Sequence, residues 1–403
     1  MHKKQKILII FGTRPEAVKM APLINILKEN SDIFDLQICV TAQHRQMLDQ
    51  VMDLFKIRSD YDLDLMKPNQ DLTDITSNVL LELRKVLKKE RPDQVIVQGD
   101  TTTTFAASLA AFYEKIEVVH VEAGLRTGNP FSPWPEEINR RITTTIASIH
   151  FAPTAKAREN LLKENISPER IYVTGNTVID ALLQVHQQII SDPSLLRNLE
   201  QNFSFLDPKK RLILVTGHRR ENFGDGFENI CRSLKQVVGE NPDIELLYPV
   251  HLNPNVQEPV KRILGLDKNS SESRIHLIEP LDYVPFVYLM SRSHLILTDS
   301  GGVQEEAPSL GKPVLVMRDT TERPEAVDAG TARLVGTNPE LVVRETNRLL
   351  SDNAFYSSMS RAHNPYGDGK ASLRILQILK KETRWNKSAS SDSDILAYQP
   401  QAS

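Results

Sequence analysis

Short apolar runs alternate with amphipathic segments along almost the whole chain. The apolar runs have the length of strands and end in glycine, proline or polar turns, whereas the segments between them place apolar residues at helical spacing. This alternation predicts an α/β fold with largely parallel sheets. The predicted strands cover residues 6–11, 37–40, 92–98, 118–121, 149–151, 170–173, 211–215, 245–250, 274–278, 295–297 and 314–317.

The alternation pauses once near the middle, where residues 176–207 have the pattern of a connecting helix and a linker. We therefore predict two Rossmann-like domains, at 1–175 and 176–365. A closing amphipathic helix is expected at 366–382. Residues 383–403 are rich in serine and small residues without periodicity, which predicts a disordered tail.

A glycine turn follows the predicted strand at 295–297. Gly301 and Gly302 allow close backbone approach, and a helix that begins there directs N–H groups and its positive end at an anion such as phosphate. Two adjacent glycines alone would favour an ordinary turn of a parallel α/β protein over a ligand site. Glu306 within the helix and Arg323 beyond the next strand add a carboxylate for ribose hydroxyls and a guanidinium for diphosphate, so the stretch predicts a nucleotide site.

The first turn, at residues 12–16, has a similar plan but is not a GxGxxG fingerprint. Arg14 lies in this turn and Lys19 about one helical turn further on. Either side chain could be a solvated helix charge. Because a cation near a helix start opposes the dipole, a functional role is favoured for both.

Three carboxylates lie where ligands of open α/β sheets collect. Asp100 and Glu122 end successive predicted strands, and Glu136 begins a helix after the loop at 127–135. Asp100 could instead be the N-cap of the next helix, and Glu136 an acidic first-turn residue. Together they are typical of acid–base chemistry. His218 follows a further predicted strand. A lone histidine is more often structural, but the preceding glycine and the charges after it favour a role in the site.

Composition limits the classes of function. The chain has 403 residues, 40% hydrophobic residues and a net charge of −3, which suits a two-domain soluble enzyme and gives no basic surface for nucleic acid. We expect no membrane span, no signal peptide and a cytoplasmic location with Cys39 and Cys231 reduced. The histidines and cysteines lack metal-ligand spacing, so no metal is expected.

Six motifs resemble the non-hydrolysing UDP-N-acetylglucosamine 2-epimerases, in order, over residues 6 to 380. The resemblance implies a glycosyltransferase-B type fold, with two Rossmann-like lobes facing a cleft, an N-terminal catalytic domain and a C-terminal UDP-binding domain. It also implies a homodimer without cofactor that supplies an activated sugar for cell-surface polysaccharide. The motifs are GTRPEAVKMAPL (12–23), GDTTTT (99–104), HVEAGLRT (120–127), PEEINR (135–140), GHRREN (217–222) and TDSGGVQEEAPSLGKPVLVMRDTTERPE (298–325).

The resemblance implies the reaction of this family, which interconverts UDP-GlcNAc and UDP-ManNAc. UDP is eliminated to give 2-acetamidoglucal and is then added again. The resemblance assigns proton transfer and cation stabilisation to Asp100, Glu122 and Glu136, and diphosphate departure to His218. The residues that it implies for substrate binding are Arg14, Lys19, Arg140, Ser300, Gly301, Gly302 and Arg323, with Glu306 at the ribose and Phe286 near the uracil.

Some relatives in this family are activated by UDP-GlcNAc bound beside the active site. Gln43, Gln46 and His251 match the residues of that allosteric site. Asn69 stands where those relatives have an arginine, which leaves activation open.

Two other functions share these features. A hydrolysing epimerase of the same fold would release ManNAc and UDP, although the GDTTTT and GHRREN motifs resemble the non-hydrolysing group more closely. A nucleotide-sugar glycosyltransferase or a non-catalytic UDP-sugar sensor is the alternative from another class, and the three carboxylates disfavour a mere binder.

Overall fold

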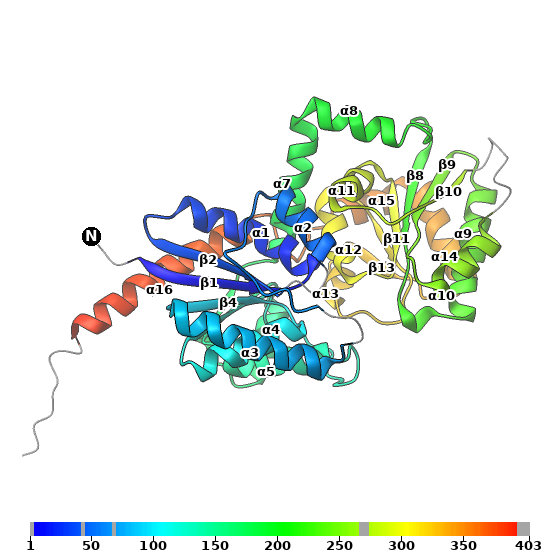
Figure 1. Cartoon of the computed structure of the whole chain (residues 1–403). Coiled ribbons are helices and arrows are strands. Elements are labelled where there is room, and N and C mark those ends of the chain that lie inside the picture. Colours follow the sequence, from blue (N-terminus) through cyan, green and yellow to red (C-terminus); the bar gives the residue numbers. More distant parts are fainter. Residues whose placement is uncertain (1–3, 42–44, 67–69, 266–273, 393–403) are drawn as a thin grey trace, which may run out of the picture. The chain divides into compact units, whose positions relative to one another are not determined.

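The computed structural model describes residues 4–41, 45–66, 70–265 and 274–392. The chain forms two compact units (Figure 1). The first combines the residues up to Asp180 with those from Gly369 onward, and the second comprises Ala181–Asp368. The last helix of the chain therefore belongs to the first unit.

The first unit is built on a parallel sheet of seven strands in the order β3-β2-β1-β4-β5-β6-β7. Strand order reverses between β1 and β4, which is the switch point of a Rossmann sheet and the usual place for a ligand. The strands are β1 (Gln5–Phe11), β2 (Phe34–Val40), β3 (Tyr61–Asp62), β4 (Gln94–Gln98), β5 (Glu117–Val121), β6 (Ile149–Ala152) and β7 (Ile171–Val173).

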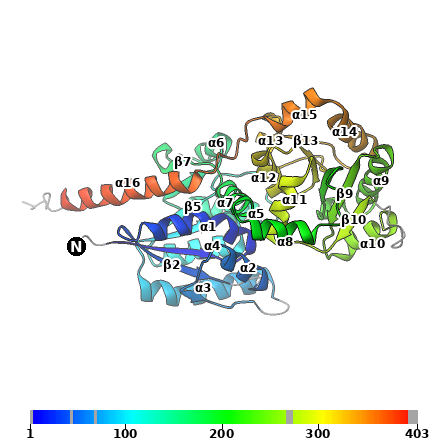
Figure 2. The same cartoon turned by 90° about the horizontal axis from the view of Figure 1, so that it is seen from above.

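Helices cover both faces of this sheet. Helices α3 and α4 lie on one face, and α1, with α16 packed beside it, lies on the other (Figures 1 and 2). The helices of this unit are α1 (Arg14–Glu29), α2 (Arg45–Leu54), α3 (Leu72–Glu90), α4 (Thr102–Tyr113), α5 (Glu136–Ile146), α6 (Ala155–Lys163), the first residues of α7 (Thr177–Ser191), α16 (Ala371–Asp392) and the 3₁₀ turn η1 (Pro168–Arg170).

A buried apolar core lies between the sheet and helices α3 and α4. Alternate residues of β1 and β4 point into it, and α4 presents the small residues Ala106, Ala107 and Ala110, which let the helix approach the sheet. Leu83 and Leu87 of α3 lie a turn apart and complete the layer. Burial of these side chains fixes which face of each strand points into the core.

The second unit repeats the plan with six parallel strands in the order β10-β9-β8-β11-β12-β13. Its strands are β8 (Arg211–Thr216), β9 (Ile244–Pro249), β10 (Ile275–Ile278), β11 (Leu295–Thr298), β12 (Val314–Val316) and β13 (Ala332–Leu334). Its helices are the rest of α7, α8 (Pro193–Asn202), α9 (Asp225–Glu240), α10 (Pro254–Ile263), α11 (Tyr283–Arg292), α12 (Gly301–Glu306), α13 (Pro324–Asp328), α14 (Pro339–Ser351) and α15 (Asn353–Ser360), with 3₁₀ turns η2 (Arg220–Asn222) and η3 (Ala307–Leu310).

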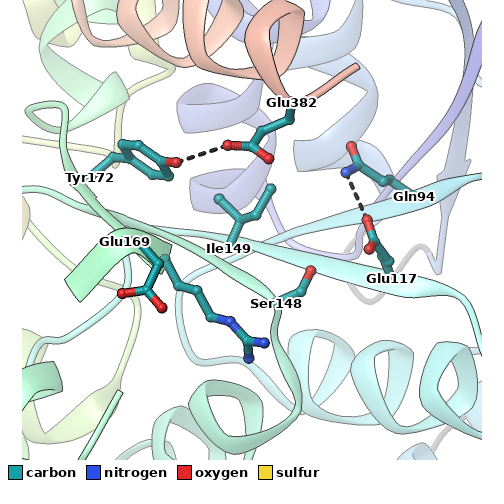
Figure 3. Close-up of a pocket in the computed structure, with 8 residues that line it drawn as sticks. Gln94, Glu117, Ser148, Ile149, Glu169, Tyr172 and Glu382 are labelled. Carbon is teal, nitrogen blue, oxygen red and sulfur yellow. Dashed lines mark hydrogen bonds between the residues drawn. The ribbon is translucent and has the colours of Figure 1, made fainter. Parts of the chain in front are cut away.

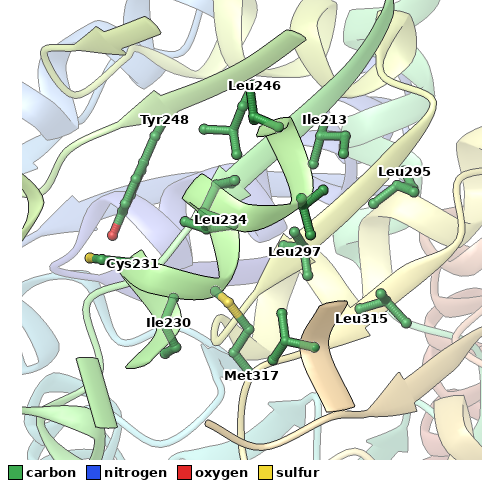
Figure 4. Close-up of a cluster of buried hydrophobic side chains, with 14 of the residues drawn as sticks. Ile213, Ile230, Cys231, Leu234, Leu246, Tyr248, Leu295, Leu297, Leu315 and Met317 are labelled. Atoms are coloured by element: carbon green, nitrogen blue, oxygen red, sulfur yellow. The ribbon is translucent and has the colours of Figure 1, made fainter. Parts of the chain in front are cut away.

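The core of the second unit lies between this sheet and α9. Figure 4 shows Ile213, Leu246 and Leu297 from adjacent strands facing Ile230 and Leu234 of α9. All five side chains are almost completely buried. Removal of that much apolar surface from water is the main stabilising contribution to such a layer.

The predicted fold class, two Rossmann-like domains with parallel sheets, is confirmed by these sheets. Sequence patterns missed β3, which has only two residues, the short β13, and helix α2. Helix α16 begins later than the predicted closing helix and continues past residue 382 into the predicted tail; residues beyond 392 lie outside the described part of the chain. Within the described residues, no helix has both the length and the apolar character needed to cross a bilayer.

Two histidines lie side by side inside the first sheet, His120 on β5 and His150 on β6. Burial lowers the pKa of His120 to about 4 and that of His150 to about 3. Both are therefore neutral in the folded protein, whereas the unfolded chain protonates them near pH 6.5. Because the unfolded state binds more protons below that pH, the free energy of unfolding should decrease as pH falls from about 6.5 towards 4.

Replacement His150→Leu removes one of these sites. We expect urea unfolding at pH 6.5 and pH 4.5 to show a pH-dependent loss smaller by about 1–3 kcal/mol in the variant than in the parent. The exposed His363, changed to Asn, is the matched control and should leave the slope as in the parent. An unchanged slope in the His150 variant would contradict the assignment.

Candidate active site

Glu122 is the most densely hydrogen-bonded of the predicted catalytic residues. It follows β5 with a φ of 62°, a left-handed conformation that is uncommon for glutamate. Lys19 of α1 donates to both carboxylate oxygens, at 2.6 and 2.7 Å. Gln98 donates to one oxygen, and Asn176 donates to the other at 2.9 Å. The carboxylate is thus held in one orientation, with a cation beside it and 7% of the residue exposed.

Asp100 follows β4, which pairs with β5, the strand that precedes Glu122. A Cβ atom on Gly99 would be only 3.3 Å from Oε2 of Glu122, and the φ of 70° at Gly99 also favours glycine. Arg140 of α5 donates to Oδ2 of Asp100 through Nε at 2.9 Å and Nη2 at 2.8 Å. Asn139 donates to the Asp100 carbonyl oxygen at 3.0 Å. Adjacent strand ends therefore bring together two carboxylates, each bound to its own cation.

The interpretation of Asp100 as a helix cap is wrong. The N-cap of α4 is Thr101, whose hydroxyl accepts from the Thr104 N–H at 3.1 Å. The side chain of Asp100 is left to contact Arg140, with about a quarter of its surface exposed.

Glu136 begins α5 and is half-buried, and its Oε2 atom has no hydrogen-bond partner among the described residues. The neighbouring Glu137, which sequence reasoning missed, fixes the preceding loop by accepting from the N–H groups of Thr127 and Gly128, both at 3.1 Å. Burial raises the pKa of Glu137, but these donors and Arg140 outweigh it and lower the pKa overall. The loop and α5 are therefore joined by Glu137, while Glu136 keeps an oxygen for another partner.

Glu16 supports the turn that carries Arg14. Its Oε2 atom accepts from the N–H groups of Gly12 at 3.1 Å and Thr13 at 2.8 Å, and its Oε1 atom accepts from the Thr101 hydroxyl at 2.7 Å. Burial raises the pKa of Glu16, partly offset by these donors. Glu16 thus ties the turn after β1 to the turn after β4. The Thr-x-x-Glu spacing of a capping box was the sequence signal that could have identified it.

In the second unit, Asp299 organises the turn that contains His218. Its Oδ2 atom accepts from the backbone N–H groups of His218 and Arg219, both at 2.8 Å, and it is completely buried. Its Oδ1 atom lies 3.7 Å from Nδ1 of His218. Burial lowers the pKa of His218, Asp299 opposes this, and His251 and Arg219 lower it further. The backbone at His218 is thus held by a carboxylate that sequence reasoning had not singled out.

Alternating charges lie beside this turn. Arg318 donates to Glu221 at 2.5 Å and to Glu322 at 2.6 Å, and Arg323 donates to Glu305 and contacts Glu322, both at 2.8 Å. Burial raises the pKa of Glu322, but Arg323, Arg318 and Arg219 lower it to about 2. The predicted cation Arg323 is therefore present at the glycine turn together with matching carboxylates.

Helix α12 carries the rest of the predicted nucleotide residues. A Cβ atom on Gly301 would be 2.9 Å from the Arg323 guanidinium, so only glycine fits there without displacing it. Ser300 is the N-cap of α12, and Gly302 follows Gly301. Glu306 accepts a hydrogen bond of 2.8 Å from the Tyr283 hydroxyl. The residues expected to bind the nucleotide thus come from one short stretch of chain. They are the start of α12, the buried Glu306 and Arg323.

Phe286, expected near the uracil, lies half-buried within α11, whose N-cap is Asp282. Tyr283, on the same helix, is the residue that contacts Glu306. Sequence patterns missed this helix because Pro285 lies inside its first turn, where proline is tolerated.

Of the three residues predicted for the allosteric site, the structure describes two, His251 and Gln46. His251 stacks on His218, with ring centroids 5.4 Å apart and planes 20° apart. Gln46 lies in α2, and Gln43 and Asn69 are outside the described residues. Among the residues that the structure describes, no group of three or more histidine, cysteine, aspartate or glutamate side chains could hold a metal ion.

Comparison with known proteins identifies one family. The family model for UDP-N-acetylglucosamine 2-epimerase matches residues 26–380. The chain is 60% identical over 375 residues to the UDP-N-acetylglucosamine 2-epimerase of Escherichia coli K12, covering 93% of this chain and 98% of that protein. It is similar to the crystal structure of the Neisseria meningitidis UDP-GlcNAc 2-epimerase bound to UDP-GlcNAc, with 52% identity, a TM-score of 0.88, and coverage of 94% and 100%. The Methanocaldococcus jannaschii enzyme in complex with UDP-GlcNAc and UDP gives 37% identity, a TM-score of 0.77, and coverage of 94% and 100%.

Proposed function

The chain belongs to the UDP-N-acetylglucosamine 2-epimerase family, and we propose that it interconverts UDP-GlcNAc and UDP-ManNAc without hydrolytic release of the sugar. The observation that carries this proposal is the pair of carboxylates, Asp100 and Glu122, at adjacent strand ends. Each has its own cation, Arg140 for Asp100 and Lys19 for Glu122. Such pairing holds each carboxylate in one place, as a positioned acid–base group requires.

The chemistry requires elimination before epimerisation. The proton on sugar C2 has no neighbouring carbonyl and is poorly acidic. Cleavage of the C1–O bond places the bonding electrons on UDP and builds positive charge at C1, which acidifies the C2 proton. A carboxylate then takes that proton, and 2-acetamidoglucal and UDP result. Re-addition of UDP, with a proton delivered to the opposite face of C2, gives the epimer.

In this proposal the first unit carries out the proton transfers. Glu122, Asp100 and Glu136 supply carboxylates for the two faces of C2 and for the positive charge at C1. Lys19, assigned to substrate binding by resemblance, is bonded to Glu122, so we propose that it also positions this residue. Arg140, also assigned to substrate binding, is bonded to Asp100, and we propose that it positions Asp100 in the same way.

The second unit, in the same proposal, holds UDP. The N–H groups at the start of α12 and the guanidinium of Arg323 suit a diphosphate, and Glu306 suits the ribose hydroxyls. His218, oriented by Asp299, assists the departure of the diphosphate. Because Arg323 is already bonded to Glu305 and Glu322, binding of the diphosphate would compete with those ion pairs. The residues proposed to bind substrate are Arg14, Lys19, Arg140, Phe286, Ser300, Gly301, Gly302, Glu306 and Arg323.

The location, oligomeric state and pathway are proposed from membership of the family. We propose a cytoplasmic homodimer that uses no cofactor and supplies an activated sugar for cell-surface polysaccharide.

Proton NMR of the purified protein with UDP-GlcNAc in D₂O tests the reaction. We expect UDP-ManNAc to appear with deuterium at C2, because the proton returned to that carbon comes from solvent. Free ManNAc and UDP would instead show a hydrolysing epimerase. An unchanged spectrum despite binding of UDP would overturn the proposed reaction and direct the search to a glycosyl acceptor.

A further inference from the structure

The Arg323 guanidinium is bound to carboxylates of its own unit. It donates through Nε to Oε1 of Glu305 and contacts Glu322 through Nη1, both at 2.8 Å. Glu305 is completely buried near the end of α12, so its carboxylate is placed by the backbone of that helix. The direction in which Arg323 points therefore depends on what holds the end of α12 and the start of α13, the helix whose N-cap is Arg323.

Asn364 fixes the end of α12. Its Nδ2 atom donates to the carbonyl oxygen of Glu305 at 2.8 Å and to the hydroxyl of Ser309 in η3 at 2.6 Å. Its Oδ1 atom accepts from the N–H group of Tyr366 at 3.0 Å. Asn364 is 8% exposed, so water replaces these bonds poorly. One buried amide thus joins Glu305, the partner of Arg323, to the backbone of Tyr366.

Tyr366 holds the start of α13. Its side chain is completely buried, and its hydroxyl donates to Oε2 of Glu325 at 3.2 Å. Glu325 lies in the first turn of α13, directly after the N-cap Arg323 and Pro324. Burial raises the pKa of the Tyr366 hydroxyl, and the neighbouring carboxylates of Glu305 and Glu325 raise it further. The hydroxyl therefore stays protonated and remains a hydrogen-bond donor at neutral pH.

We propose that Asn364 and Tyr366 are positioning residues for the binding of diphosphate by Arg323. Asn364 orients Glu305, and Tyr366 fixes the start of α13, so the guanidinium is supported through both of its neighbouring helices. Neither residue belongs to any of the six motifs noted in the sequence. This inference rests on the proposed function, because it assumes that the second unit holds UDP.

Calorimetric titration of the full chain with UDP tests the proposal. Tyr366→Phe removes the hydroxyl and keeps the ring, and Asn364→Ala removes the amide. Each should raise the Kd for UDP about five- to tenfold, the change expected when a buried hydrogen bond is lost. Steady-state kinetics should show a similar rise in KM for UDP-GlcNAc and a smaller change in kcat, because Arg323 holds the diphosphate before and during the reaction.

Tyr172→Phe is the matched control. The Tyr172 hydroxyl also donates to a glutamate, Glu382 of α16, at 2.8 Å, and Figure 3 shows this bond in the first unit. Because UDP is proposed to be held by the second unit, loss of this hydroxyl should leave the Kd for UDP as in the parent. Circular dichroism establishes that each variant is folded.

A double-mutant cycle with Arg323→Ala decides whether Tyr366 acts through Arg323. In the Arg323→Ala background, Tyr366→Phe should change the Kd for UDP by no more than about twofold, because the group that it positions is already gone. Equal factors in both backgrounds would show a general effect on the fold and would overturn the proposal, as would parental Kd values in both single variants. A parent that binds no UDP would overturn the proposed function, and this inference with it.

Discussion

Replacement Glu122→Gln should lower kcat about 10²–10⁴-fold, because an amide cannot accept the C2 proton. The shape of the side chain is kept, and the carbonyl oxygen of the new amide can still accept one of the hydrogen bonds that Lys19 and Asn176 now donate. We therefore expect a folded protein whose KM for UDP-GlcNAc changes little. Steady-state kinetics by NMR or a coupled assay measures both constants.

The control for this prediction is Glu159→Gln, which removes an exposed carboxylate from the same unit and should retain parental kcat. Exchange of the C2 proton with D₂O should decrease in parallel with kcat in the Glu122 variant. A variant with kcat within threefold of the parent would exclude Glu122 from proton transfer and leave Asp100 and Glu136 as the candidates.

Replacement Asp299→Ala should lower the free energy of unfolding of the second unit by about 3–5 kcal/mol. The backbone N–H groups of His218 and Arg219 would lose their common acceptor in a completely buried place. Asp299→Asn keeps an acceptor oxygen, so the loss should be roughly half as large or less. Urea unfolding followed by circular dichroism, with hydrogen exchange at residues 218 and 219, measures the difference.

Activity separates the two variants further. Asp299→Asn lacks the negative charge that faces Nδ1 of His218 at 3.7 Å, so kcat should fall even though the fold is kept. Equal unfolding midpoints for the Ala and Asn variants would contradict the role of Asp299 as the acceptor of this turn.

Much of the fold could be predicted because apolar runs of strand length recur between helical patterns. That pattern depends on local side-chain polarity, which sequence carries directly. Short elements were missed for the same reason: β3 has two residues, and its register with β2, Cys39 to Tyr61, is set by hydrogen bonds between distant segments. Helix α11 was missed because Pro285 resembled a loop signal.

The candidate site was predicted in part. Residues at strand ends, such as Asp100 and Glu122, could be placed at one edge because parallel strands align their carboxyl ends. Their partners could not be predicted, since Lys19 and Glu122 are 103 positions apart in the chain and meet only through packing of α1 on the sheet. Asp299 and Glu137 were missed because their functions depend on backbone N–H groups, which every sequence contains.

The sequence alone determined the α/β class, the two-domain plan and the residue types available for nucleotide binding and acid–base chemistry. Tertiary structure alone decided which cation is paired with which carboxylate, and that Thr101 rather than Asp100 caps α4. The physical reason is range. Polarity and turn propensity act between neighbours in the chain, whereas ion pairs and buried hydrogen bonds depend on distances of a few ångströms between segments that only folding brings together.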